Sequence, residues 1–389
     1  MYVLEVRGSG RERGRAHGEA LRDLVHEHLE RWRQALLDDV VVDPDTYVTE
    51  FLADTDFEPT ARRWTPDLLD EARGICEAAG TDWRYTFTRL LSDEEPWYRR
   101  ARKLGAWPGR SRLPSRRPED DPLVVGARGK GCSSVGRNAT AGMPALIAQN
   151  MDMSTWCDGH QLLLRVADPA TGVEAMVFTL PGKISLCGMN NLGLGIACNS
   201  LLQLDYDPAG LAEDFVVRGY LAQESVEAGL EFLRRVPHAS GQNYTVSGPG
   251  GEVLNLECSK GGVVGWRPWP GADRVYHTNH PLASRDDAIY RELVVPLAPE
   301  QRDRVCSWTT AARLAELGRW FGDPQVPVTI ERAKAAFSSR VGPVCRHGEH
   351  EGRKDIYTLG CIVMSFGDPP TLEVAPGPPD VTPFQTFRF

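Results

Sequence analysis

The sequence lacks any long apolar run. No stretch of about 18 apolar residues occurs in the chain, so the sequence predicts no transmembrane helix. Residues 1–10 contain no apolar run of the length that a signal peptide requires. We therefore expect a cytoplasmic protein that does not insert into a membrane.

Positive charge is also in short supply. The formal net charge of the 389 residues is −9 and the pI is near 5.6. A protein that is acidic overall binds nucleic acid and anionic membrane surfaces poorly. Only six of the 44 basic residues are lysine, which we attribute to genome composition and not to a site. The sequence predicts no nucleic-acid partner.

The nine cysteines lack the pattern of a disulfide framework or of a zinc ribbon. Their number is odd, they are widely spaced in a long chain, and no CxxC pair occurs. We therefore expect reduced thiols, most of which fill the core as small apolar side chains. A functional cysteine needs an argument of its own.

Helical patterns dominate the first ninety residues. Apolar residues recur at helical spacing over 11–37, and Thr65-Pro66 is typical of a helix start that Gly80 would end. A further helix is predicted over 82–91. Residues 92–121 are rich in proline, glycine and charge, which predicts an exposed connection extending to about residue 130.

Short strand-like runs follow residue 132. Gly, Pro, Asn and Asp turns separate these runs, and four further helices are expected among them. The order of helices, strands, paired helices and strands favours an antiparallel sheet packed against helical layers, which is an α+β class. Strands are predicted over 2–6, 145–149, 161–166, 173–180, 194–199, 243–247, 253–257, 356–366 and 372–375, and helices over 213–223, 226–236, 309–321 and 329–337.

Two local patterns resemble ligand-binding motifs, one for a dinucleotide and one for a metal ion, but neither has the full spacing of its motif. Glycines at 8, 10 and 14 follow a strand and open a helix, yet a dinucleotide fingerprint needs its third glycine at 13, where Arg13 stands. Histidines at 277, 280, 347 and 350, with Cys345, could supply metal ligands. We predict no metal, and keep a metal-dependent hydrolase that uses His277, His280 and His347 as a minor alternative.

The strongest local signal is Gly131-Cys132, directly before a predicted strand. Glycine tolerates the strained backbone that attack on its own carbonyl requires. The Cys132 thiol could attack the Gly131 carbonyl and form a thioester that water hydrolyses. The freed α-amino group, with an ordinary pKa of about 7.7–8.0, could then act as general base for its own thiol.

Several motifs in order resemble one family. They resemble the acyltransferase branch of the N-terminal nucleophile (Ntn) hydrolases, typified by isopenicillin N acyltransferase and classed as peptidase family C45. The blocks that carry the resemblance are residues 13–22, Gly131-Cys132 with the two serines that follow, 148–152, 188–201, 255–259 and 277–280.

The resemblance implies a four-layer αββα sandwich with two antiparallel sheets. It implies cleavage into an α chain, 1–131, and a β chain, 132–389, that stay together as a heterodimer. Cys132 would be nucleophile and processing site, Asp152 would orient the site, and Asn279 would donate to the oxyanion. Gln149, Asn150, Ser259 and His280 lie in matching blocks and are candidates for substrate contact or support.

The implied activity is transfer or hydrolysis of an amide-linked acyl group through a Cys132 thioester. The partners would be a small-molecule acyl donor and an amine acceptor. No cofactor is expected, although acyl-coenzyme A is a possible co-substrate. Gln149, three residues before Asp152, favours the acyltransferase side, and Arg353 and Lys354 are the nearest matches to the family's late arginine.

The residues leave three other functions open. A pure amide or peptide hydrolase would use the same chemistry without an amine acceptor. A non-catalytic homologue would keep the fold and never be processed; Lys130, where the family often has an acid, is a departure at the processing site. The third is the metal-dependent hydrolase.

Overall fold

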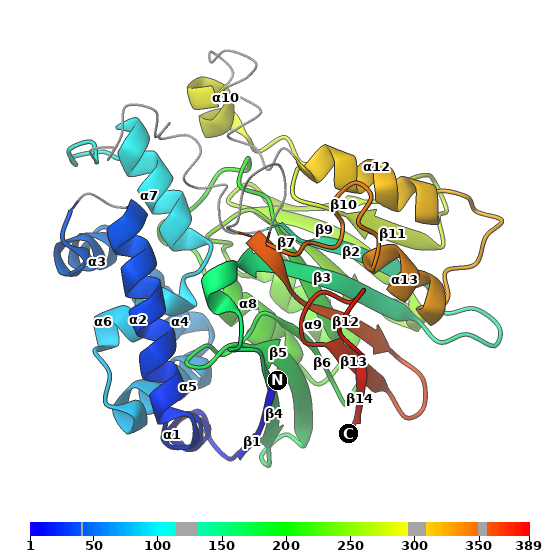
Figure 1. Cartoon of the computed structure of the whole chain (residues 1–389), viewed down its shortest axis with the longest axis horizontal. Helices are drawn as coiled ribbons and strands as arrows, with labels where there is room; N and C mark the ends of the chain where they lie inside the picture. Colours follow the sequence, from blue (N-terminus) through cyan, green and yellow to red (C-terminus); the bar gives the residue numbers. More distant parts are fainter. Residues whose placement is uncertain (40–41, 114–130, 295–308, 349–355) are drawn as a thin grey trace.

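The strands form two sheets that lie face to face (Figure 1). The computed structural model describes residues 1–39, 42–113, 131–294, 309–348 and 356–389. Strands β2 and β3 of one sheet contact β7 and β8 of the other. The first sheet consists, in spatial order, of β1 (Tyr2–Arg7), β4 (Leu162–Asp168), β5 (Val173–Thr179), β6 (Cys187–Asn190), β7 (Gly195–Ser200), β8 (Gln242–Ser247), β9 (Val253–Ser259) and β10 (Gly262–Trp266). The second consists of β11 (Arg274–His277), β2 (Ser133–Arg137), β3 (Leu146–Ser154), β12 (Ile356–Ser365), β13 (Thr371–Ala375) and β14 (Gln385–Arg388).

Helices cover the outer face of each sheet. On the first sheet, α8 (Glu213–Leu221) contacts β6 and β7, and α9 (Val226–Arg235) contacts β10. On the second, α12 (Thr309–Phe321) contacts β11, and α13 (Ile330–Phe337) contacts β3 and β12. The α+β class and the αββα sandwich are therefore confirmed. The strand pairs are antiparallel as predicted, except that β1 runs parallel to β4.

The N-terminal helices form a group at one side of the sandwich (Figure 1). The segment predicted as one helix over 11–37 is two, because the chain turns at Leu21. The helices of this group are α1 (Gly10–Ala20), α2 (Arg22–Asp39), α3 (Pro44–Ala53), α4 (Phe57–Trp64), α5 (Pro66–Ala79), α6 (Trp83–Leu90) and α7 (Glu94–Leu104); α10 (Ala288–Val294) and the short 3₁₀ helices at Thr155–Cys157 and Pro249–Gly251 lie elsewhere.

Glycines let α1 lie against α5 at very short range. A Cβ placed on Gly14 would lie 2.0 Å from the backbone oxygen of Glu71, and one on Gly10 would lie 1.8 Å from that of Asp67. Gly18 and Gly74 make equally close approaches. These glycines therefore serve helix packing, which accounts for the glycine-rich pattern near residue 8 without a nucleotide.

Residues 92–104 are not the exposed connection that their composition predicts. They contain helix α7, and most of their side chains are buried. Glu95 lies 3.4 Å from Arg99, and Arg102 lies 2.9 Å from Glu50, so paired charges replace water in this helix. The remainder of the predicted connection, residues 114–130, lies outside the described residues, as do Lys130, Cys306, Arg353 and Lys354.

The alternation of β3 separates two environments next to the site. Side chains of successive strand residues point to opposite faces of the sheet. Ile147 belongs to the core between the sheets, whereas Leu146 and Ala148 belong to the cluster under α12 and α13. Met151 and Asp152 therefore point to opposite faces.

The described residues contain no helix long and apolar enough to cross a membrane.

Candidate active site

Cys132 lies directly before β2, between the two sheets. Only 2% of its surface is exposed, and its Sγ lies 3.5 Å from Sδ of Met151. On the next inward-facing position, Ser134 donates to Asn199 of β7 at 2.8 Å, so β2 is tied to the facing sheet. The thiol is thus held on the inner face of a central strand, where its position is fixed by packing.

Asn279 holds the backbone nitrogen of Cys132. Its Oδ1 accepts from the Cys132 amide at 2.8 Å and from Nη2 of Arg313 at 2.7 Å. Its Nδ2 donates to the carbonyl of Ser200 at 3.1 Å. Because both neighbours of Oδ1 are donors, the orientation of the amide is fixed by its partners. The structure brings Asn279 to Cys132 as predicted, but through the oxygen and not through the expected NH₂ donor.

Two buried arginines surround Gly131 and Cys132. Nη1 of Arg313, on α12, donates to the Cys132 carbonyl at 2.5 Å and to Oγ of Ser133 at 3.1 Å. A Cβ on Gly131 would lie 3.1 Å from Nη1 of Arg346. Burial, and then the neighbouring charge of Arg346, lower the pKa of Arg313 to about 9. One cationic side chain therefore bonds the Cys132 carbonyl, and another lies beside Gly131 in the space that a Cβ would take.

Asp152 supplies the counter-charge for these arginines. Its Oδ2 lies 3.2 Å from Nε of Arg346, and its Oδ1 accepts from Thr358 at 2.8 Å. Burial raises the pKa of Asp152, whereas Arg346, Arg313 and Thr358 oppose this shift. Its backbone carbonyl accepts from the Gly131 amide at 3.3 Å. Asp152 is therefore bonded to Gly131 through its backbone and paired with Arg346 through its carboxylate, and its orienting role stays a prediction.

Gln149 and Asn150 fasten β3 to the layers on either side of it. Gln149 points inward, donates to the carbonyl of Cys198 on β7 and accepts from the Cys198 amide at 3.3 Å. Asn150 points outward and donates to the carbonyls of Phe337 and Val344 at 2.8 and 2.9 Å. Both side chains are fully buried. Their contacts support the scaffold and give no indication of substrate contact.

The side chains of Ser259 and His280 bond to residues of a neighbouring loop and of α12, respectively. Oγ of Ser259 donates to Asp286 at 2.6 Å, which closes a loop after β9. Nδ1 of His280 lies 2.8 Å from Oγ1 of Thr310, the residue that also accepts from the Asn279 amide. Burial, then His277 and Arg313, lower the pKa of His280 to about 4. His280 therefore supports the loop of Asn279 as a neutral imidazole.

The three histidines of the metal-dependent alternative do not form one ligand set. His277 lies 2.9 Å from Glu257, whereas His347 lies 2.7 Å from Asp380. Within the ranges that the structure describes, the one group of three close metal-ligating side chains is Cys345, His347 and Asp380. The histidine geometry therefore contradicts that alternative.

Arg313 and Arg346 are the site residues that sequence reasoning missed. Thr309, Arg313 and Leu317 lie on one buried face of α12, so the signal was an arginine inside an apolar helical stripe. Arg346 stands between Cys345 and His347, and no local pattern singled it out. A buried arginine needs a carboxylate partner, and Asp152, predicted to orient the site, is that partner.

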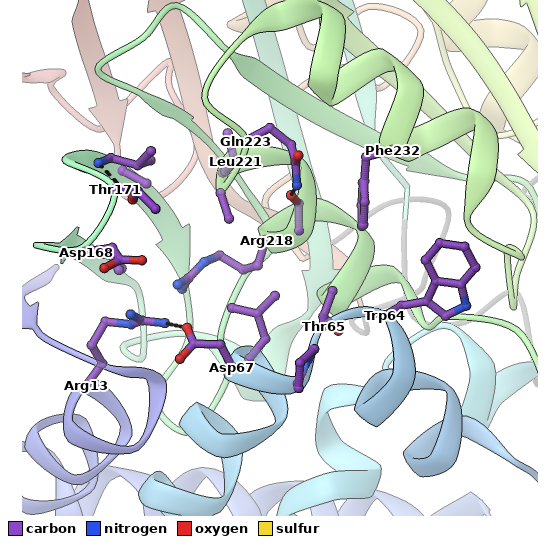
Figure 2. Close-up of a pocket in the computed structure, with 17 residues that line it drawn as sticks. Arg13, Trp64, Thr65, Asp67, Asp168, Thr171, Arg218, Leu221, Gln223 and Phe232 are labelled. Atoms are coloured by element: carbon purple, nitrogen blue, oxygen red, sulfur yellow. Dashed lines mark hydrogen bonds and ion pairs between the residues drawn. The ribbon is translucent and has the colours of Figure 1, made fainter.

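A hollow lies elsewhere, between the N-terminal helices and α8 and α9 (Figure 2). It has an empty volume of about 820 Å³, and Trp64 and Phe232 line its apolar side. Its arginines are already paired, since Arg13 bonds Asp67 and Arg218 lies 3.1 Å from Glu71. Cys132, Asp152 and Asn279 do not line this hollow.

Comparisons with known proteins agree with the motif analysis. Residues 139–296 match the family model described as acyl-coenzyme A:6-aminopenicillanic acid acyl-transferase, which is less than half of the chain. The match contains Asp152 and Asn279 and begins after Cys132. No curated protein matches the sequence.

Solved structures of two acyl-amide hydrolases share a weak likeness to the chain. A variant of the conjugated bile acid hydrolase from Clostridium perfringens is 14% identical, with a TM-score of 0.37 over 66% of this chain and 97% of that one. The penicillin V acylase from Agrobacterium tumefaciens is 12% identical, with a TM-score of 0.34 over 66% of this chain and 85% of that one. By its central segment, the chain is similar to the acyl-coenzyme A:6-aminopenicillanic acid acyl-transferase family, the resemblance that its motifs predict.

Proposed function

We propose that the protein is a self-cleaving Ntn cysteine enzyme that transfers or hydrolyses an amide-linked acyl group. One observation carries the proposal. Cys132 lies directly before β2, its nitrogen is held by Asn279, Arg313 donates to its carbonyl, and the guanidinium of Arg346 lies beside Gly131. The match to the acyltransferase family model supports the same chemistry.

Maturation would begin with attack of the Cys132 thiol on the Gly131 carbonyl. The S–C bond forms, the C–N bond breaks, and the leaving nitrogen of Cys132 takes up the proton. Water then hydrolyses the thioester and releases the Gly131 carboxylate. Negative charge develops on the Gly131 oxygen during both steps, and a nearby cation such as Arg346 stabilises it.

Turnover would use the freed amino group as general base. Asn279 would keep this nitrogen in place, because its Oδ1 already accepts from it in the uncut chain. The base takes the thiol proton as sulfur attacks the acyl carbonyl, and returns a proton to the leaving amine. The neutral Asn279 and the paired Asp152 and Arg346 need no reorganisation during this cycle.

Release of the acyl group decides between hydrolysis and transfer. Water as acceptor gives an amidohydrolase, and an amine gives an acyltransferase; acyl-coenzyme A is retained as a possible donor. The two activities are separated by measuring free acid and new amide in parallel, with rising concentrations of added amines. Gln149, although buried against Cys198, was the sequence feature that favoured transfer.

Intact mass under denaturing conditions tests the proposal most directly. We expect two fragments that meet between Gly131 and Cys132, and we expect Cys132→Ala to remain one chain without activity. Cys76→Ala is the matched control, since Cys76 is a buried thiol in α5 outside the site. It should split like the wild type. Splitting of Cys132→Ala at the same bond would overturn the mechanism.

A further inference from the structure

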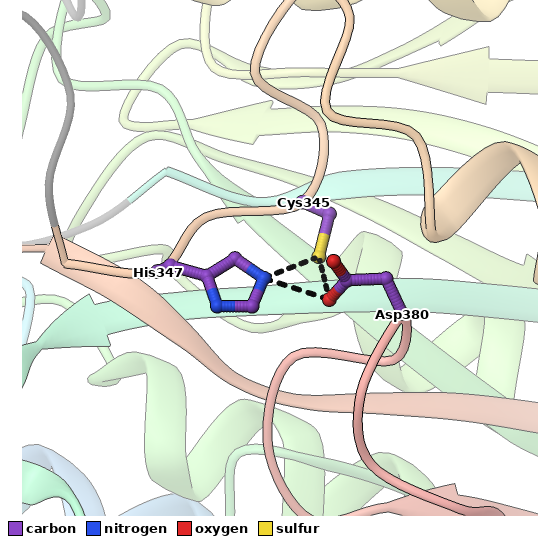
Figure 3. Close-up of side chains that lie close together, drawn as sticks. All are labelled: Cys345, His347 and Asp380. Atoms are coloured by element: carbon purple, nitrogen blue, oxygen red, sulfur yellow. Dashed lines mark hydrogen bonds and ion pairs between the residues drawn. The ribbon is translucent and has the colours of Figure 1, made fainter.

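We propose that Cys345, His347 and Asp380 form a binding site for a divalent transition metal such as zinc. The three side chains converge from two loops, as Figure 3 shows. Cys345 and His347 precede β12, and Asp380 lies between β13 and β14. The site is separate from the His277 and His280 pair, and metal binding to it can be tested without the acyl activity.

The ligand chemistry favours a metal of intermediate softness. Thiolate, imidazole and carboxylate are the three ligand types that zinc takes in proteins, at about 2.0–2.3 Å. Tetrahedral coordination at these lengths places the ligand atoms about 3.3–3.5 Å apart. Here Sγ lies 3.9 Å from Nε2 of His347 and 3.2 Å from Oδ1 of Asp380, and Nε2 lies 2.7 Å from that oxygen. Coordination therefore requires the Sγ–Nε2 separation to shorten by about 0.4 Å, the Sγ–Oδ1 separation to widen slightly, and the Nε2–Oδ1 separation to widen by about 0.6 Å.

Each ligand atom remains available for coordination. Arg340 lies 2.7 Å from Oδ2 of Asp380, which leaves Oδ1 facing the thiol and the imidazole. The side chains of His347 and Asp380 are 31% and 15% exposed, so the site opens to solvent on one side. Cys345 is buried at the closed end. A metal would therefore hold three protein ligands and one water.

The same group is a poor nucleophilic site. Burial, and then the hydrogen bond to Asp380, raise the pKa of Cys345 to about 12. The thiol donates to the carboxylate at 3.2 Å, whereas the imidazole of His347 lies farther from the sulfur, at 3.9 Å. Binding would replace this hydrogen bond: the S–H proton leaves to solvent, an S–metal bond forms, and no redox change occurs.

The metal site is linked through Arg346 to the surroundings of Cys132. Arg346 stands between two of the three ligands, its Nε lies 3.2 Å from Asp152, and its guanidinium lies beside Gly131. Its backbone amide is already held by Thr358 at 3.0 Å. A metal bound to residues 345 and 347 would fix both neighbours of this arginine, and would act as a positioning element for it.

The test uses untagged, reduced full-length protein titrated with cobalt(II), and separately with zinc(II). We expect one equivalent of cobalt to give thiolate-to-cobalt absorption, and zinc to displace it. Cys345→Ser, His347→Gln and Asp380→Asn should each weaken binding at least about tenfold. Cys76→Ser is the matched thiol control, since Cys76 lies in α5 outside the site, and it should bind like the wild type.

Two results would overturn the proposal. One is the absence of stoichiometric binding to the wild type, which needs no variant to fold. The other is cobalt absorption that survives Cys345→Ser but is lost in Cys132→Ala, which would place the metal at the catalytic thiol. Circular dichroism of each variant checks that a loss of binding is not a loss of fold.

Discussion

Arg346 and Asp152 bring opposite charges together where little water reaches them. Asp152 is fully buried and Arg346 is 7% exposed. Removing one partner of a buried pair leaves an uncompensated charge and costs about 3–5 kcal/mol. We expect Arg346→Met to lower the free energy of unfolding by roughly this amount. Arg346→Met with Asp152→Asn should recover part of it, because the amide needs no cation.

Urea unfolding in a Cys132→Ala background measures this effect on a single intact chain. The control pair is Arg235 and Glu231, which lie 3.4 Å apart on α9 with both side chains 67% exposed. Breaking that pair should cost at most about 0.5 kcal/mol. If the two changes at Arg346 and Asp152 add without recovery, their charges are not coupled.

Asn279 has two separable tasks, since its oxygen holds the Cys132 nitrogen and its NH₂ group faces the opposite way. Asn279→Ala removes both, and we expect turnover to fall roughly 100-fold or more with a smaller change in KM. Asn279→Asp keeps an acceptor for Cys132 and for Arg313. Single-turnover rates compare the two variants.

A fall of similar size in both variants would assign the main role to the NH₂ donor, as the sequence analysis predicts. Substantial activity in Asn279→Asp alone would assign it to the oxygen that holds the nitrogen. Unchanged turnover in Asn279→Ala would remove this residue from the site.

Motif order located Cys132, Asp152 and Asn279, because these residues lie in short segments with distinctive neighbours. The arginines were not recognised, since a lone arginine in a helix or a loop has no local pattern. Gln149, Asn150, Ser259 and His280 lie in the same motifs and turned out to bond the scaffold. Sequence motifs mark the segments that build a site, and only the backbone geometry separates the side chains that face it from those that face away.

Among the elements, α1 and α5 depend most clearly on glycine. A Cβ on Gly14 would overlap the backbone oxygen of Glu71, and backbone yields less readily than a side chain. We expect Gly14→Ala to destabilise the protein by about 1–3 kcal/mol or more through overpacking. Thermal and urea unfolding of the Cys132→Ala background measure the change.

Gly318 on α12 provides a control of opposite sign. The nearest atom to a Cβ there is the hydroxyl of Tyr276 at 3.9 Å, which is ordinary contact. Gly318→Ala should therefore stabilise the helix by up to about 1 kcal/mol. Equal effects of the two substitutions would mean that the α1–α5 interface relaxes without cost.

Most helices and strands were predicted from the periodicity of apolar residues and from residues typical of helix ends. Pro66 begins α5 and Gly80 ends it with a left-handed φ of 74°, as the sequence predicts. Helix α7 was missed because its charged residues indicate an exposed segment when they are considered one at a time. Their partners, such as Glu50 for Arg102, lie on other helices and become visible only in the fold.

Across the whole molecule, buried neutral histidines lower the free energy of unfolding as the pH becomes acidic. Burial lowers the pKa of His17 and of His238 to about 4. The unfolded chain takes up protons at these residues near pH 6.5, whereas the folded chain does not until pH 4. Their contribution is therefore complete above pH 6.5 and is lost as pH falls toward 4.

His238→Gln isolates one of these contributions. By linkage, the titration of His238 should lower the free energy of unfolding of the wild type by about 2 kcal/mol between pH 7 and pH 5. The variant lacks this titration, so its free energy of unfolding should fall by about 2 kcal/mol less over the same interval. Urea midpoints of both proteins at the two pH values give the difference. A difference that does not change with pH would show that His238 titrates normally in the folded chain.

The first strand has a consequence for how the protein can be reassembled. β1 enters the first sheet parallel to β4 from the far end of the segment that cleavage would detach. The uncut chain folds in a first-order reaction, because every partner is tethered. After cleavage the same pairing joins two molecules, so refolding becomes second order and its yield depends on concentration. A cleaved and unfolded copy would therefore refold less efficiently at low protein concentration than the uncut precursor does.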